Sequence, residues 1–98
     1  MIIEIIFTHD IMRRTVGVTV KPSSDNELLP YAFLIHIAEV VRFQCHPNTG
    51  FEDIIDLWVF ELNKVKHTYA DVTIKVTTKS IELLIPDHLT TLFDLQYS

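Results

Sequence analysis

The alternation of apolar and polar residues at the start of the chain predicts two strands. Residues 2 to 8 are rich in isoleucine, and residues 15 to 20 alternate strictly. The alternation places three valines on one face of the second strand: Val16, Val18 and Val20. A period of two residues is typical of a half-buried β-strand. Residues 9 to 14, which include Arg13 and Arg14, are then the exposed and basic tip of a hairpin.

The same alternation returns towards the C-terminal end of the chain. Residues 71 to 77 and 81 to 85 alternate, and residues 78 to 80 form a short turn between them, which predicts a second hairpin. The residues on the face opposite the core are polar, as expected for an antiparallel sheet with one face towards solvent. They are Glu4, Thr15, Thr19, Thr73, Lys75, Thr77 and Glu82.

Apolar residues at helical spacing predict two helices between the hairpins, from Pro30 to about Cys45 and from about Gly50 to His67. The sequence from Thr49 to Glu52 has the form of a capping box at the start of the second helix. Residues 24 to 27 have the same form, but Pro30 lies too deep for an uninterrupted helix that begins there. We therefore expect a turn or a kink before residue 30.

A short closing helix is predicted after Pro86, because Leu89, Leu92 and Phe93 follow at helical spacing and proline suits a first helical position. The element order is then ββααββα. It predicts a two-layer α+β sandwich, in which an antiparallel sheet made of two β-hairpins carries two main helices on one face. We expect a single domain over residues 1–98. The pattern leaves the strand order open.

The polar faces of the two main helices carry unexpected apolar residues. Phe60 lies in the middle of the polar side of the second helix, and Ile35 and Phe43 lie on that of the first. If the helices lie side by side, these three form an apolar centre with a charged rim that includes His36, as in a protein interface. The candidate partner-binding residues are Phe60, Asp53, Asp56, His67, Phe43, Glu39 and Ile35. In one alternative the closing helix covers these positions, and in another they form a homodimer interface.

Composition and charge narrow the classes of partner. The chain has 98 residues, a net charge of −5 and 48% hydrophobic residues. An acidic chain has the wrong sign to bind nucleic acid through phosphate contacts, so a basic or neutral protein surface is the expected partner. The longest uncharged run, residues 28 to 38, is too short to cross a membrane. The N-terminal residues lack the basic region of a signal peptide, and the lone Cys45 suits a reducing compartment, so we expect a cytoplasmic protein.

The residues that carry chemistry show no catalytic, metal or cofactor pattern. The five histidines lack the spacing of metal ligands. Cys45 and His46 are neighbours, but adjacent residues on a helix point in different directions and do not pair as nucleophile and base. Gly17 and Gly50 are the only glycines, too few for a phosphate-binding loop. We therefore expect no catalytic residues, no bound metal and no cofactor.

These observations predict a non-enzymatic protein-binding module that masks a partner through its helical face. An inhibitor, an immunity or antitoxin-like protein, or a phage-encoded antagonist belongs to this class. The alternative is a dimeric regulatory domain that senses a small molecule between its layers, with Arg13, Arg42 or a histidine as the polar anchor. An enzyme is a third hypothesis, and it requires a pocket that gathers several of the following with a carboxylate: His36, Cys45, His46 and His67.

Overall fold

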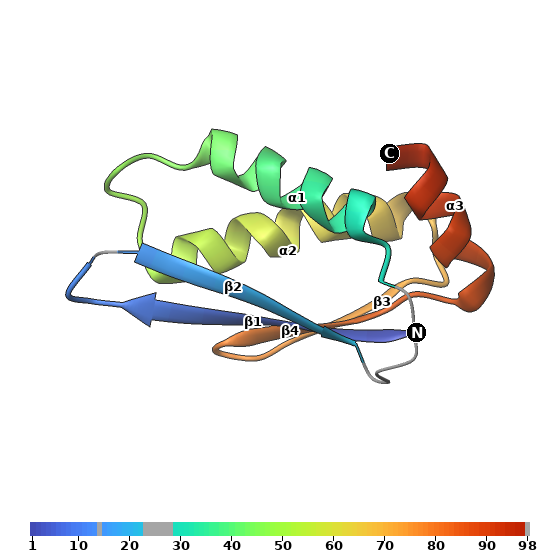
Figure 1. Cartoon of the computed structure of the whole chain (residues 1–98), viewed down its shortest axis with the longest axis horizontal. Coiled ribbons are helices and arrows are strands. Elements are labelled where there is room, and N and C mark those ends of the chain that lie inside the picture. Colours follow the sequence, from blue (N-terminus) through green and yellow to red (C-terminus); the bar gives the residue numbers. More distant parts are fainter. Residues whose placement is uncertain (14, 23–28, 98) are drawn as a thin grey trace.

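The computed structural model of the chain describes residues 1–13, 15–22 and 29–97. Within these residues, four strands form one antiparallel sheet in the order β2-β1-β4-β3 (Figure 1). The elements are β1 (Ile2–Asp10), β2 (Thr15–Pro22), α1 (Tyr31–Gln44), α2 (Phe51–Thr68), β3 (Thr73–Val76), β4 (Ser80–Leu84) and α3 (Asp87–Tyr97). This arrangement confirms the predicted fold class and element order, and the bounds of the two main helices agree with the prediction to within a residue.

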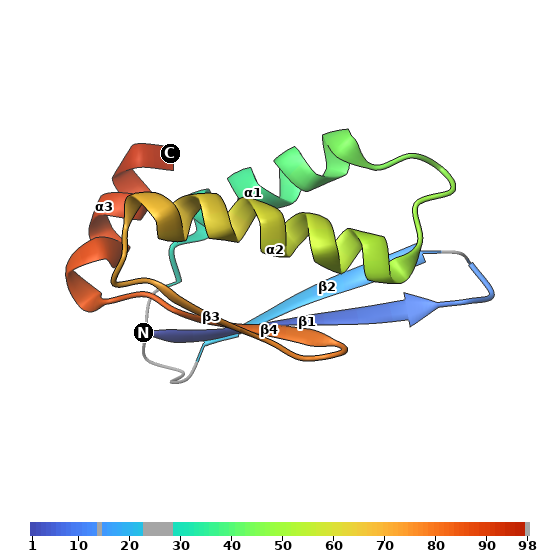
Figure 2. The same cartoon turned by 180° about the vertical axis from the view of Figure 1, so that it is seen from behind.

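The two hairpins join through their first and last strands. β1 pairs with β2 from Ile3↔Pro22 to Asp10↔Thr15, and its first half pairs with β4 from Ile2↔Leu84. The β1–β2 hairpin therefore extends past the end of β4 as a two-stranded arm (Figure 1). Figures 1 and 2 show α1 and α2 on one face of the sheet, and α3 at the end where the N-terminus lies.

The core lies between the sheet and the two main helices. Alternate residues of the central strands are fully buried, and each main helix contributes a buried stripe. The ring of Phe7 meets the edge of Trp58 at 5.8 Å between centroids. The buried apolar residues of β1, β4, α1 and α2 are Ile3, Ile5, Phe7, Ile81, Leu83, Phe33, Leu34, Ile37, Val41, Ile55, Trp58, Leu62 and Val65.

The closing helix α3 packs against the first turns of α1. The ring of Phe93 lies 4.8 Å from that of Phe33 and 4.9 Å from that of Tyr69, between centroids. Leu89 and Phe93 are buried by this contact, whereas Leu92 is 43% exposed. The alternative in which α3 covers the apolar residues on the outer helix faces is therefore wrong. The residues in ring contact with α3 include Phe33, which belongs to the inner stripe of α1.

The predicted capping box at the start of α2 is also wrong. Gly50 is the N-cap residue, with extended backbone angles and no side-chain capping bond. The hydroxyl of Thr49 instead accepts a hydrogen bond of 2.7 Å from the backbone N–H of His46. The helix begins one residue later than the capping box requires, so the hydroxyl closes the preceding turn. The other capping-box candidate, residues 24 to 27, and Arg14 at the hairpin tip lie outside the described residues.

Candidate functional site

The outer face of α2 carries the predicted binding residues of this helix. Phe60 is 56% exposed, although Trp58 and Leu62 on either side of it are buried. Residues four and seven positions away from Phe60 share its face, because the helix repeats every 3.6 residues. This face, directed away from the sheet, carries Asp53, Asp56, Phe60, Lys64 and His67, all of them exposed. Two carboxylates therefore lie one and two turns before an exposed aromatic ring.

A cation covers part of the Phe60 ring. The Nζ atom of Lys64 lies 4.6 Å from the ring centroid, within the range of a cation–π contact. The same ammonium group forms an ion pair with Glu61 at 3.2 Å. A partner that packs on Phe60 would therefore also meet the ammonium group of Lys64 beside the ring.

Glu61 links the outer face of α2 to α1. Its side chain is only 8% exposed, and its Oε1 atom accepts a hydrogen bond of 3.0 Å from the Nε2 atom of Gln44. A buried carboxylate requires such partners, because its desolvation is unfavourable. Neither Glu61 nor Gln44 stands out as a candidate in the sequence. The helical spacing does indicate that Glu61 is buried, because it lies three residues after Trp58 and four before Val65, on the inner side of the helix.

The outer face of α1 carries the remaining predicted residues. Ile35 is 55% exposed and Phe43 is 90% exposed. With Glu39 they lie at intervals of four residues, and so follow one side of the helix. Glu39, Arg42 and Phe43 line a hollow of about 530 Å³. The lining of this hollow therefore combines an aromatic ring, a carboxylate and a guanidinium group.

The outer faces of α1 and α2 point to the same side of the molecule (Figures 1 and 2). The link that the structure provides between them is the Gln44–Glu61 hydrogen bond. Ile35, Phe43 and Phe60 each keep more than half of their side-chain surface exposed. On this side, α1 therefore presents Ile35 and Phe43, and α2 presents Phe60. His36, predicted for the rim, packs against Tyr97 of α3 at 4.9 Å between ring centroids.

The tip of the β1–β2 hairpin also carries exposed apolar residues. Ile11 is 77% exposed and Met12 is 93% exposed, although only the basic residues of this loop had been singled out as candidates. The Nε atom of Arg13 lies 3.8 Å from Oδ2 of Asp10, and Oδ1 of Asp10 accepts a hydrogen bond of 3.1 Å from the backbone N–H of Arg13. The guanidinium group is therefore paired within the loop, which weakens the hypothesis that it anchors a ligand.

Two histidines, His9 and His46, line one hollow beside the tip of the β1–β2 hairpin. The ring of His9 stacks on Phe51 at 5.2 Å between centroids, and both line a hollow of about 450 Å³ with His46 and Val16. Among the described residues, no group of three or more histidine, cysteine, aspartate or glutamate side chains is placed to hold a metal ion. This hollow and the one beside Arg42 each contain a residue that the small-molecule alternative names as a polar anchor.

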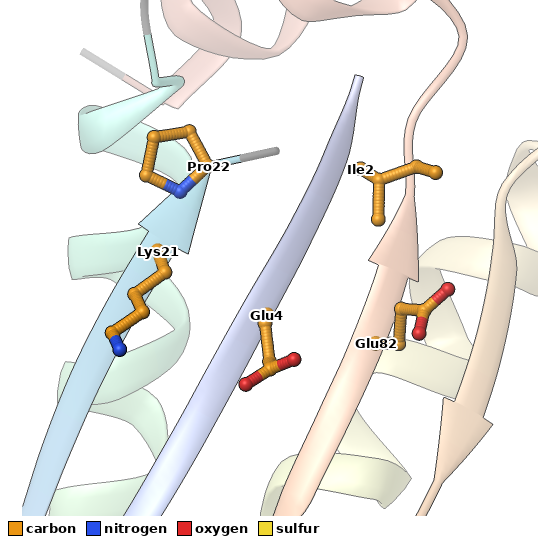
Figure 3. Close-up of a pocket in the computed structure, with 5 residues that line it drawn as sticks. All are labelled: Ile2, Glu4, Lys21, Pro22 and Glu82. Carbon is orange, nitrogen blue, oxygen red and sulfur yellow. The ribbon is translucent and has the colours of Figure 1, made fainter. Parts of the chain in front are cut away.

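The sheet face away from the helices carries a row of charges. Lys21, Glu4, Glu82 and Lys75 lie opposite one another on four neighbouring strands. Figure 3 shows Ile2, Glu4, Lys21, Pro22 and Glu82 around a shallow hollow on this face. The predicted polar face is therefore present, but it also contains the exposed apolar residues Ile2 and Leu84.

Comparisons of the chain with protein-family models, with curated proteins and with solved structures found no match. Among the described residues, no helix combines the length and the apolar character needed to cross a membrane.

Proposed function

We propose that the protein is a non-enzymatic binding module that masks a partner protein with the outer faces of α1 and α2. The observation that carries this proposal is the exposure of three large apolar side chains on these helices: Ile35, Phe43 and Phe60. Each lies on the side of its helix away from the core. Aromatic residues are enriched at the centres of protein interfaces, and polar residues at their rims.

The charges on these faces favour a basic partner. Asp53 and Asp56 precede Phe60 on α2, and Glu39 lies beside Phe43 on α1. The chain as a whole carries a net charge of −5. Such a charge accelerates encounter with a basic surface and disfavours acidic competitors. An inhibitor, an immunity or antitoxin-like protein, or a phage-encoded antagonist that acts in the cytoplasm fits this chemistry, and the lone Cys45 suits a reducing compartment.

A pull-down with variants of the tagged protein tests the proposal. We expect the wild type to retain one protein in near-stoichiometric amount, and the Phe60→Asp and Phe43→Asp variants to lose it. Leu92→Asp is the matched control, because Leu92 is a similarly exposed apolar residue on a different helix. Retention of the same protein by both phenylalanine variants would contradict the proposal.

The retained protein is then purified and its affinity measured by calorimetry. We expect Asp53→Asn combined with Asp56→Asn to weaken binding, and Glu4→Gln combined with Glu82→Gln to leave it unchanged. Both pairs remove two negative charges, but the second pair lies on the opposite face of the molecule. Equal effects of the two pairs would show that net charge, rather than the helical face, determines binding. A thermal melt of each variant verifies that it is folded.

A further inference from the structure

The two edges of the sheet differ in how well they are protected. β3 has four residues, with Lys75 among them. β2 has eight residues and carries no charge from Thr15 to Val20. Natural sheets protect their edges with short strands and with charged residues, lysine above all, because an unprotected edge pairs with other chains. The β3 edge has both protections, and the β2 edge has neither along most of its length.

The backbone register shows which groups the β2 edge exposes. Phe7 donates its backbone N–H to Lys79 at 2.8 Å, and Ile85 donates to Met1 at 2.9 Å, so the odd-numbered residues of β1 bond towards β4. In an antiparallel strand the residues alternate in direction, so the even-numbered residues of β1 bond towards β2. Thr8 and Ile6 lie opposite Gly17 and Thr19. The residues of β2 that point their N–H and C=O groups away from β1 are therefore Val16, Val18 and Val20.

The side chains of these valines lie on the helix side of the sheet. Val18 pairs with Phe7 and Val20 with Ile5, both of which are buried in the core. Val16 and Val20 are partly buried against the core, whereas Val18 is 42% exposed. A strand added to this edge would therefore bond three free backbone positions and also cover an exposed apolar side chain.

We propose that a second copy of this chain pairs antiparallel along β2, around a twofold axis at Val18. The valines recur symmetrically about this residue, so the edge is complementary to itself. Val18 would lie opposite the partner's Val18, and Val16 opposite the partner's Val20. Because a directly opposed pair exchanges two hydrogen bonds, these three pairs would supply about six.

The charges and side chains across the axis are compatible with this pairing. Lys21 would lie opposite the partner's Thr15, so no like charges meet. Gly17 would lie opposite the partner's Thr19, on the open face of the sheet. The interface leaves the outer faces of α1 and α2 free, so this proposal does not depend on the proposed function. The dimer would present two copies of the helical face.

The test is the mass of the full chain in solution, measured by sedimentation equilibrium over a range of concentrations. We expect the wild type to reach twice its chain mass of 11.4 kDa. Val18→Lys should weaken the dimer by at least about tenfold, because the two introduced ammonium groups would face each other across the axis. Val76→Lys is the matched control: Val76 is 49% exposed on the same side of the sheet, but at the β3 edge. We expect it to remain dimeric.

Amide hydrogen exchange of the wild type gives a second readout that does not depend on any variant. We expect the amides of Val16, Val18 and Val20 to become protected as the protein concentration rises, while the amide of Val76 does not change. A wild type that stays monomeric at every concentration would overturn the proposal. So would a dimer that persists in folded Val18→Lys, or one that is lost in folded Phe60→Asp, since the latter would place the interface on the helices.

Discussion

Two phenylalanines of α1 lie in opposite environments although they are ten positions apart on one helix. Phe33 is fully buried and contacts the rings of Phe93 and Tyr97. Phe43 is 90% exposed. We expect Phe33→Ala to lower the free energy of unfolding by about 3–5 kcal/mol, because it leaves a cavity. Phe43→Ala should change it by less than about 0.5 kcal/mol. Urea denaturation measures both, and a large loss in Phe43→Ala would contradict its assignment to the surface.

The hydrogen bond between Gln44 and Glu61 couples α1 to α2 at the level of single residues. A hydrogen bond to a charged group contributes about 1.5–3 kcal/mol when its partners are well aligned. Gln44 is exposed, so its amide can bind water after the bond is lost. We therefore expect a double-mutant cycle of Gln44→Ala and Glu61→Ala to give a coupling free energy of about 1 kcal/mol. The Lys64–Glu61 ion pair is the comparison, because the side chain of Lys64 is 59% exposed and the pair should couple more weakly.

At the scale of elements, α3 is held by aromatic contacts that include a titratable group. Burial, and secondarily the negative charge of ionised Tyr69, raises the pKa of Tyr97 above its usual value of 10.0. The unfolded chain therefore releases this proton at lower pH than the folded chain. The contribution of Tyr97 to the free energy of unfolding is complete below the pKa that Tyr97 has in the unfolded chain. It is lost as pH rises through the pKa that Tyr97 has in the folded protein. The midpoint temperature of thermal unfolding should therefore fall as pH rises above about 10, and we expect it to fall less in Tyr97→Phe than in the wild type. An equally steep decline in the variant would show that other groups cause it.

At the scale of the whole molecule, the N-terminal strand β1 pairs in the middle of the sheet with β4, which belongs to the second hairpin. The helices then pack over strands from both hairpins, so no part of the core forms from one half of the chain alone. We expect a single cooperative unfolding transition. The fluorescence of Trp58, the one tryptophan and 3% exposed, should change at the same urea concentration as the circular dichroism of the helices. Two separate transitions would contradict the prediction of one domain.

The spacing of apolar residues predicted the strands and helices, because it depends only on which side of each element is buried. The alternation in β1 and β4 and the helical spacing in α1 and α2 reflect which side of the element is buried, so the sequence determined these elements and their inner faces. The exposed positions of Phe43 and Phe60 followed from the same spacing. The start of α2 was predicted less well. The hydroxyl of Thr49 could cap the helix or accept a hydrogen bond from the preceding turn, and in the structure it bonds to His46 while Gly50 is the N-cap residue.

The tertiary structure alone decided how the elements meet. The order β2-β1-β4-β3 depends on the pairing of residues about 80 positions apart, such as Ile2 with Leu84, and no local pattern encodes such a pairing. The structure also decided that α3 covers Phe33 and leaves Phe43 and Phe60 exposed, and that the carboxylate of Glu61 bonds to Gln44. The sequence by itself determined which side of each element is apolar. Which apolar residues stay exposed depended on the neighbours that the fold supplies.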